Sequence, residues 1–429
     1  MDYFNYKNGR LFAEDVQVER IVSRVGTPAY IYSKTTFQDH LLKIQKAYSR
    51  LDTTVCYSVK ACGNINILTF LAEAGGGFDV VSGGELWRVL QTGVDASKIV
   101  YAGVGKTDTE IIEALKAGIG YFNIESEAEL ENLIRLTKQN CSANFKPPRA
   151  ALRVNPDVDP ETHAYTTTGK GETKFGIDIE RAQKVFADYG RNEAVNLCAI
   201  HIHLGSAGRT VQPYIEAIEK VLVLIERLRA DGFVIEVLNI GGGYGADYAT
   251  GTAPTASDYA AGIVPLLRGK NLKLILEPGA TIAANAAILV TRVLYLKTGG
   301  RRKFVIVDAG MNDLIRPPLY SAFHFIWPVE TAEKFVPAGR GRDLQLKGTE
   351  VVDVVGPVCE SADFFAQARA LPPVKRGDLV SVFTAGAYGF SMSSNYNARC
   401  RAVEVLVDGG KFKVIRKREI YEDLIALEK

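Results

Sequence analysis

The chain has 429 residues, more than one hydrophobic core usually holds, so we expect two domains. With 47% hydrophobic and 23% charged residues, the composition is typical of a globular protein and not of a disordered or fibrous one. The 51 Lys and Arg residues nearly balance 49 Asp and Glu residues, which argues against nucleic acid or an anionic membrane as a partner.

The first residues lack the apolar core of a signal peptide, and no apolar stretch is long enough to span a bilayer. The six cysteines are scattered without metal-ligand spacing, and several lie in apolar runs, as reduced cysteines do. We therefore expect a cytoplasmic protein.

From about residue 53 to 280, short apolar runs alternate with segments of helical periodicity. Continuous Val, Ile and Leu runs are typical of parallel strands buried on both faces. The expected strands are 53–59, 78–81, 98–102, 120–124, 150–154, 197–203, 235–240 and 272–276. The expected helices are 65–74, 85–92, 108–117, 127–138, 179–189, 214–230 and 257–267. Eight such repeats predict a (β/α)8 barrel over residues 33–282, with an open doubly wound sheet as the alternative.

The pattern changes after residue 283. Two hairpins are expected, each with a glycine-containing turn between its strands, at 288–296 with 303–307 and at 401–407 with 411–416. Residues 29–32 and 379–383 are also strand-like. The sequence predicts a β-rich domain, a β-barrel or sandwich, formed by residues 1–32 and 283–429.

Polar residues and glycines follow the expected barrel strands, where the active sites of such barrels lie. They are Lys60, the segment 78–85, Glu125, Arg153, His201, His203, the segment 241–245 and the segment 277–279. Lys60 alone is also compatible with an ordinary surface lysine. An amine in a pocket, however, can lose its proton and form a Schiff base.

The other strand ends suggest roles for a cofactor site. Gly241, Gly242 and Gly243 permit close approach of backbone N–H groups to a phosphate, although a glycine triplet is also compatible with a simple turn. We expect His203 to be a flat platform for a ring and His201 to be a packed structural residue. A carboxylate such as Glu277 can act as a general base or bind a protonated ring nitrogen. Together these groups fit pyridoxal phosphate (PLP).

Several motifs resemble the alanine-racemase-like, barrel-type PLP decarboxylases over nearly the whole chain. In the barrel these are residues 57–61 (YSVKA), 78–85, 174–176, 203–206 (HLGS), 241–245 (GGGYG) and 277–279 (EPG). In the second domain they are residues 316–320, 356–361 (GPVCES) and 386–390. The Cys-Glu-Ser form at 359–361 is more similar to the branch that acts on diaminopimelate than to the ornithine and arginine branch.

The resemblance implies a role for each matching residue. Lys60 would carry PLP, His203 would stack on its ring, and Glu277 would bind the pyridine nitrogen. The phosphate and the rest of the cofactor would contact Asp79, Ser206, Gly242, Gly243, Pro278, Gly279, Ala280 and Tyr388. The substrate would contact Arg316, Tyr320, Glu360 and Tyr388, with Cys359 as proton donor. A head-to-tail homodimer in which Cys359 and Glu360, with Tyr388 as a further candidate, enter the partner's site is also implied.

The implied activity is decarboxylation of meso-2,6-diaminopimelate to L-lysine and CO2. One departure matters, because the family usually has Arg after Glu-Pro-Gly, where this chain has Ala280. Loss of a carboxylate clamp weakens binding by about 1–3 kcal/mol. Arg316 alone or Arg209 would have to replace the clamp; alternatively, the substrate is ornithine, arginine, carboxynorspermidine or another amino acid.

Three further alternatives remain open from the residues. A racemase is disfavoured by the Cys-Glu-Ser segment, and a non-catalytic PLP-binding protein by the second domain. A metal-dependent barrel hydrolase would use His201, His203 and Glu277 as ligands, although no motif near the two histidines supplies a third ligand with the usual spacing.

Overall fold

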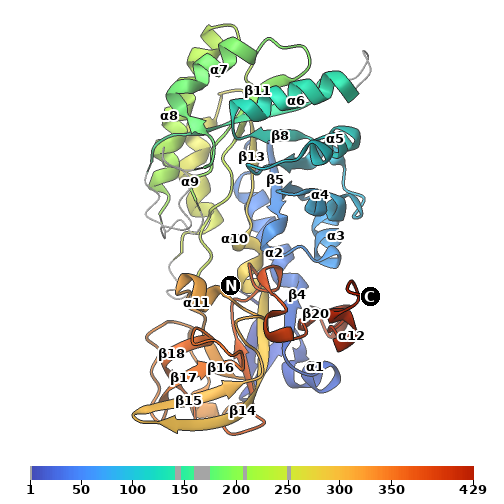
Figure 1. Cartoon of the computed structure of the whole chain (residues 1–429). Helices are drawn as coiled ribbons and strands as arrows, with labels where there is room; N and C mark the ends of the chain where they lie inside the picture. Colours follow the sequence, from blue (N-terminus) through green and yellow to red (C-terminus); the bar gives the residue numbers. More distant parts are fainter. Residues whose placement is uncertain (1, 141–145, 159–173, 206–209, 249–252) are drawn as a thin grey trace. The chain divides into compact units, whose positions relative to one another are not determined.

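A computed structural model describes residues 2–140, 146–158, 174–205, 210–248 and 253–429 of the chain (Figure 1). It divides the chain into two compact units. The first, here called the barrel unit, comprises His40–Gly245 and Ala253–Thr281. The second, the sheet unit, comprises Met1–Asp39, Ala246–Thr252 and Ile282–Lys429. In the described residues, no helix combines the length and apolar character needed to cross a membrane.

The barrel unit is built on a closed ring of eight parallel strands. These are β5 (Thr53–Ser58), β6 (Gly77–Val80), β7 (Ile99–Tyr101), β8 (Tyr121–Ile124), β9 (Arg149–Asn155), β11 (Asn196–His201), β12 (Val237–Asn239) and β13 (Lys273–Leu276). Each strand pairs with the next one in chain order, and β13 returns to β5. The short strand β10 (Ile177–Asp178) adds to β9. The predicted (β/α)8 barrel is confirmed, and the open sheet is wrong.

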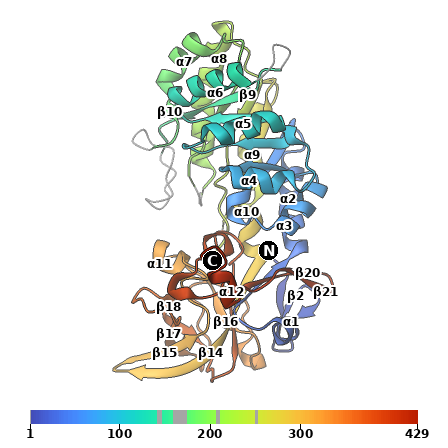
Figure 2. The ribbon, with the colours of Figure 1, turned by 45° about the vertical axis from the view of Figure 1, so that its right-hand side comes forward.

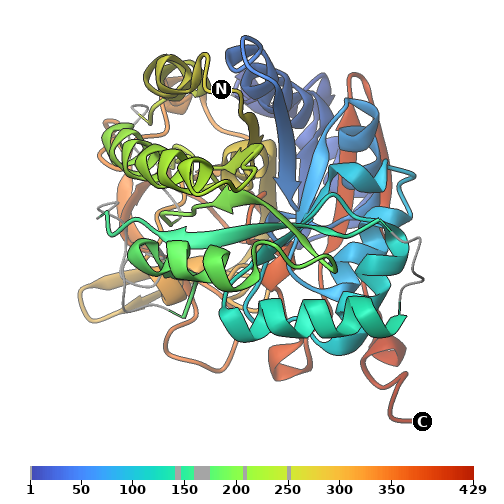
Figure 3. The ribbon, with the colours of Figure 1, turned by 90° about the horizontal axis from the view of Figure 1, so that it is seen from above.

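Helices surround this ring, as the view from above shows (Figure 3). They are α3 (Ile65–Glu73), α4 (Gly83–Leu90), α5 (Asp108–Ala117), α6 (Glu127–Asn140), α7 (Ala182–Tyr189), α8 (Gln212–Ala230) and α9 (Ala256–Leu267). Neighbouring helices pack in chain order, for example α4, α5 and α6 (Figure 2). Helix α2 (Lys34–Ala47), which precedes β5, was not predicted, and the short helix α10 (Ala280–Ala283) follows β13.

Local sequence explains how individual elements begin and end. Thr107 and Glu110 form a capping box at the start of α5, and Gly118 ends that helix in the left-handed region at φ 66°. Inside the ring, buried side chains that are small or medium in size, apart from one tyrosine, form a hydrophobic cluster. That cluster consists of Cys56, Val100, Tyr121, Ala151, Cys198, Ala199, Val237 and Ile275. An eight-stranded barrel has an interior just wide enough for such side chains.

The sheet unit contains the remaining strands. They are β1 (Phe4–Lys7), β2 (Arg10–Ala13), β3 (Val16–Gln17), β4 (Ala29–Ser33), β14 (Ala287–Gly299), β15 (Arg302–Val307), β16 (Ile326–Pro328), β17 (Glu350–Val355), β18 (Phe364–Leu371), β19 (Leu379–Val382), β20 (Val403–Asp408) and β21 (Lys411–Arg416). Its helices are α1 (Val18–Val25), α11 (Arg316–Tyr320) and α12 (Tyr421–Leu424).

The long strand β14 organises the larger sheet of this unit. Its first half pairs with β4 and β19, and its second half forms a hairpin with β15. Strand β4 also pairs with β20, so the N-terminal segment completes the C-terminal sheet, as predicted. Both predicted hairpins, β14–β15 and β20–β21, are confirmed. The small sheet β1–β2–β3 was not predicted from the sequence.

His324 is a buried histidine of the sheet unit and makes its stability depend on pH. Its Nδ1–H donates to the carbonyl oxygen of Phe383 at 2.9 Å. Burial, reinforced by the charges of Arg316 and Arg369, lowers its pKa to about 3. In the unfolded chain a histidine has a pKa of about 6.5. Between these two values the unfolded state therefore binds one more proton than the folded state.

We expect the unfolding free energy to fall as the pH drops below about 6.5, by up to about 1.4 kcal/mol per pH unit from this residue. His324→Asn should remove that part of the slope, measured by urea denaturation between pH 8 and 5. The difference at pH 8 serves as the control, because His324 is then neutral in both states. Parallel pH profiles of wild type and variant would contradict this assignment.

Candidate functional site

Lys60 lies on a single helical turn, Val59–Ala61, directly after β5. Its Nζ donates to Asp79 Oδ2 at 2.9 Å, and Asp79 on β6 is fully buried. The Lys60 side chain itself is 34% exposed. A buried carboxylate therefore holds an amine that a small molecule can still reach.

Asp79 also contacts Ser58, which in turn contacts the backbone of Glu277. The Ser58 hydroxyl oxygen lies 2.7 Å from Asp79 Oδ2 and 3.0 Å from the carbonyl oxygen of Glu277. Burial raises the pKa of Asp79, while the Lys60 ammonium opposes that rise. Its second oxygen, Oδ1, is buried without a hydrogen-bond partner among the described residues.

Glu277 follows β13, and its side chain is only 2% exposed. Its Oε1 accepts hydrogen bonds from the amides of Asn123 and Asn239, at 2.8 and 2.6 Å. Its Oε2 lies 3.4 Å from His201 Nε2. Burial alone raises the pKa of this carboxyl group, but His201, Lys60 and the Asn239 amide outweigh burial and bring the pKa well below its usual range. The group is thus a buried, ionised carboxylate.

His203 lies just past β11, and its Nδ1 accepts a hydrogen bond from the Gly205 N–H at 3.1 Å. Burial, followed by the charges of Arg153 and Lys60, lowers its pKa well below the usual value. Arg153 is held in turn by Glu125, whose two carboxylate oxygens lie 2.8 and 3.0 Å from Arg153 Nη1. The imidazole of His203 is therefore neutral at physiological pH.

The glycines after β12 permit close packing of the backbone beside Glu277. A Cβ on Gly242 would lie 2.1 Å from the carbonyl oxygen of Glu277, and one on Gly243 would lie 2.0 Å from that of Gly205. Gly243 also has a positive φ of 94°, which favours glycine. Along with Gly279, which packs on Ser58, these residues bring the ends of β5, β12 and β13 together.

In the sheet unit, Arg316 begins helix α11 within a group of tyrosines. The centre of its guanidinium group lies 4.9 Å from the ring of Tyr248, 5.7 Å from that of Tyr320 and 5.9 Å from that of Tyr388. These distances are typical of cation–π contacts. Arg316 Nε and the Tyr248 hydroxyl are both buried and lack hydrogen-bond partners among the described residues.

The other predicted substrate residues lie elsewhere in the sheet unit or outside the described residues. Cys359 and Glu360 are exposed, in the loop between β17 and β18. The Cys359 N–H donates to Asn397 Oδ1 at 2.7 Å. Ser206, predicted to bind phosphate, and Arg209, considered as a replacement clamp, both lie outside the described residues.

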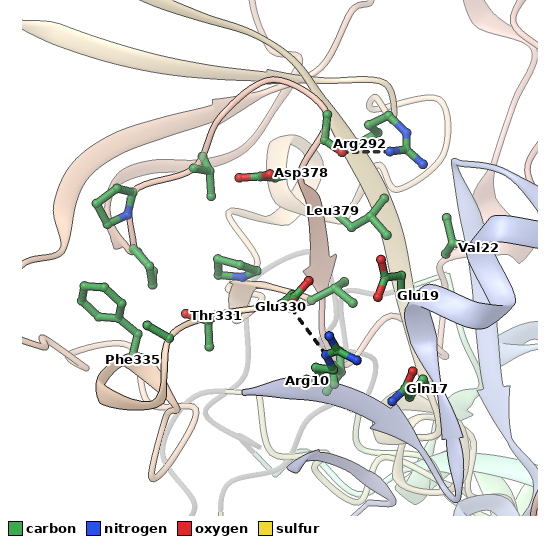
Figure 4. A pocket seen from close by; sticks show the side chains of 18 of the residues that line it. Arg10, Gln17, Glu19, Val22, Arg292, Glu330, Thr331, Phe335, Asp378 and Leu379 are labelled. Carbon is green, nitrogen blue, oxygen red and sulfur yellow. Dashed lines mark hydrogen bonds and ion pairs between the residues drawn. The ribbon is translucent and has the colours of Figure 1, made fainter. Parts of the chain in front are cut away.

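A cavity of about 690 Å³ also lies in the sheet unit, between α1, β2 and the ends of β16 and β19 (Figure 4). None of the predicted site residues lines it. The two arginines that line the cavity both bind other lining residues. Arg10 lies 3.4 Å from Glu330, and Arg292 donates to the carbonyl oxygen of Gly377. The cavity thus plays no part in the arrangement around Lys60.

Three polar residues that contact the predicted site residues were missed from the sequence, and a fourth, His201, has a contact that differs from the role expected of it. Asn123 and Asn239 bind Glu277, Tyr248 packs on Arg316, and His201, expected only to pack, approaches the Glu277 carboxylate. A signal was present for the two asparagines. Each interrupts an apolar strand, where a buried amide requires a hydrogen-bond partner.

The chain is similar to known proteins over its whole length. The pyridoxal-binding domain of the pyridoxal-dependent decarboxylases matches residues 34–284. Diaminopimelate decarboxylase from Aquifex aeolicus is 44% identical over 424 residues, covering 99% of this chain and 96% of the relative.

Two solved structures are similar over almost the whole chain. Diaminopimelate decarboxylase from Helicobacter pylori, complexed with L-lysine, has a TM-score of 0.88 at 37% identity, covering 96% of this chain and 98% of that one. The enzyme from M. jannaschii, also in complex with L-lysine, has a TM-score of 0.91 at 35% identity, with coverage of 100% and 98%. The chain therefore belongs to the pyridoxal-dependent decarboxylase family.

Proposed function

We propose that the protein catalyses the PLP-dependent decarboxylation of meso-2,6-diaminopimelate to L-lysine and CO2. The observation that carries the proposal is a reachable lysine amine, Lys60, in the same barrel mouth as a buried ionised carboxylate, Glu277. The substrate follows from the full-length similarity to diaminopimelate decarboxylases, two of which have been solved with L-lysine.

The described residues of the barrel unit fit PLP. Lys60 offers an amine beside a buried aspartate that has one unpartnered oxygen, and Glu277 offers a negative charge for a protonated pyridine nitrogen. His203 offers a neutral flat ring, which stacks without adding a positive charge next to that nitrogen. When bound, PLP supplies an electron sink for the electron pair that remains when CO2 leaves an amino acid.

Each of these barrel residues would contact a different part of the cofactor. Lys60 would bind its aldehyde carbon, His203 would face its ring, and Glu277 would hold its nitrogen. The phosphate and ring edges would contact Asp79, Ser206, Gly242, Gly243, Pro278, Gly279 and Ala280. The contact of Lys60 with Asp79 gives the amine a nearby group to which it can pass a proton.

Residues of the sheet unit would recognise the substrate. Arg316 carries a positive charge among tyrosines, and a buried Nε without a partner is available to a carboxylate. Tyr320, Tyr388 and Glu360 would bind the remaining polar groups of the substrate. The thiol of Cys359 would return a proton to the carbon that lost CO2, because the residue lies in an exposed loop with no disulfide.

We also propose that the protein forms a homodimer with shared sites and that it lies in the cytoplasm. The exposure of Cys359 and Glu360 supports the first, because exposed side chains are available to enter the site of a partner subunit. The free state of all the cysteines in the described residues is compatible with a reducing compartment.

Purified protein with PLP should release CO2 from meso-diaminopimelate and form L-lysine in equal amounts, because Arg316 supplies a charge for the distal carboxylate. It should act far more slowly on ornithine, arginine or carboxynorspermidine, which lack that group. CO2 release and chromatography of the products measure both. Faster turnover of any other amino acid, or racemisation without CO2, would overturn the substrate assignment.

Ala280→Arg is a matched variant for the same assay, because it restores the residue usual in the family. The added charge should raise kcat/KM for meso-diaminopimelate about tenfold, which corresponds to one charge-assisted hydrogen bond. An equal gain on every substrate, or none, would show that position 280 has no part in recognising this carboxylate.

Reduction of the PLP-loaded protein with borohydride should fix a pyridoxyl group on Lys60, detected by mass spectrometry of its peptides. Lys60→Ala should abolish this label and lower turnover by more than about a hundredfold. Lys98→Ala, at an exposed lysine of the same unit, is the control and should keep both. A label on another lysine, or full turnover by Lys60→Ala, would refute the role of Lys60.

A further inference from the structure

The amides of Asn123 and Asn239 converge on a single oxygen of Glu277. Both donate to Oε1, at 2.8 and 2.6 Å, and all three residues are at most 3% exposed. A carboxylate oxygen usually accepts two such bonds through its two lone pairs. Oε1 is therefore fully engaged by the two amides, whereas Oε2 receives neither of them and has His201 Nε2 at 3.4 Å.

The two amides reach Glu277 from different sides of the barrel. Asn239 ends β12, which pairs directly with β13. Asn123 lies on β8, which is separated from β13 by three strands in either direction, β5–β6–β7 on one side and β12–β11–β9 on the other. The bond from Asn123 thus spans the interior of the ring, and closure of the barrel is required to form it.

Asn239 can present only its NH₂ group to Glu277. Its Oδ1 accepts a hydrogen bond from the Gly241 N–H at 2.9 Å, and a backbone N–H can only donate. The same side chain thereby joins the first glycine of the segment 241–243 to the buried carboxylate. The contacts of one residue connect the two parts of the site that would hold opposite ends of PLP.

The strand position of Asn123 is also fixed by Lys106, which lies in the loop between β7 and α5. The buried Lys106 ammonium donates to the carbonyl oxygen of Asn123 at 2.8 Å and to that of Gly103 at 2.8 Å. Lys106 is also 2.6 Å from Glu129 Oε1, and its side chain is only 1% exposed. A buried ion pair of this kind holds the backbone from which the Asn123 amide projects.

We propose that Asn123 and Asn239 are positioning residues that lower the proton affinity of Glu277 and fix Oε2 as the oxygen presented to the cofactor's ring nitrogen. The inference rests on the proposed function. Hydrogen bonds to a carboxylate stabilise its charged form. In a hydrogen bond shared between Glu277 and a pyridine nitrogen, the two amides therefore keep the proton on the nitrogen.

Charged groups around Glu277 act in addition to the amides, because His201 and Lys60 also lower the pKa of its carboxyl group. His201 lies 3.4 Å from Oε2, the oxygen the amides leave open, and Lys60 bonds to Asp79 instead. Asp79 and Lys60 act on Glu277 with opposite signs, because one repels and the other attracts a negative charge. The amides are neutral, and they add their stabilisation without adding charge to the barrel interior.

The test uses the full-length protein loaded with PLP that carries nitrogen-15 in its ring. Asn123→Leu, Asn239→Leu and the double variant keep side-chain volume but remove the donors. The nitrogen-15 resonance should move from the protonated toward the unprotonated position, most in the double variant. We expect kcat to fall about tenfold per substitution and about a hundredfold in the double variant, with KM within about twofold.

Asn155→Leu is the matched control. Asn155 is also buried at the end of a barrel strand, but its amide donates to the carbonyl oxygen of Phe175 at 2.7 Å and not to Glu277. It should lower the melting temperature as the other variants do and leave the ring-nitrogen resonance in place. Asn123→Ser and Asn239→Ser, which are polar but too short to reach Glu277, replace any leucine variant that does not fold.

Two failures are distinguishable. A wild-type protein that binds no PLP would overturn the proposed function and this inference with it. A wild-type protein with a protonated ring nitrogen whose resonance stays unchanged in the double variant would overturn the inference alone.

Discussion

The site depends on one buried charge, the carboxylate of Glu277. A carboxylate in the interior of a barrel is costly unless hydrogen bonds or opposite charges compensate for lost hydration. Here compensation comes from Asn123, Asn239 and His201, which lie on three different strands. The contact from Asn123 crosses the ring and cannot form until the eight strands close, so the full compensation of the carboxylate is a property of the assembled ring.

The same barrel geometry explains why the other groups lie where they do. Parallel strands end on one side of the ring, so residues that directly follow β5, β11 and β13 meet at one mouth. Lys60, His203 and Glu277 occupy those positions, and glycines replace larger residues where backbone segments touch. The alignment of the strand ends thereby brings an amine, a neutral ring and a carboxylate together, and no single loop has to carry all three.

The sequence could predict the ring and most of its mouth because the strands are apolar and the polar residues follow them directly. It could not predict Asn123 as a partner of Glu277, because that pairing joins opposite strands and depends on closure and register. The small sheet β1–β2–β3 was missed because its strands have only two to four residues, too few to show a period. Tyr248 was missed because it follows the glycine segment at a position with no periodic pattern.

The ionisation of Glu277 can be measured directly. In protein labelled with carbon-13 at glutamate side-chain carboxyls, Glu277→Gln identifies the resonance of Glu277 by its disappearance. We expect this resonance to keep the chemical shift of a carboxylate from pH 8 down to pH 4, where an ordinary glutamate, with a pKa of about 4.3, is already mostly protonated. Titration of Glu277 with a midpoint near that ordinary value would contradict the account.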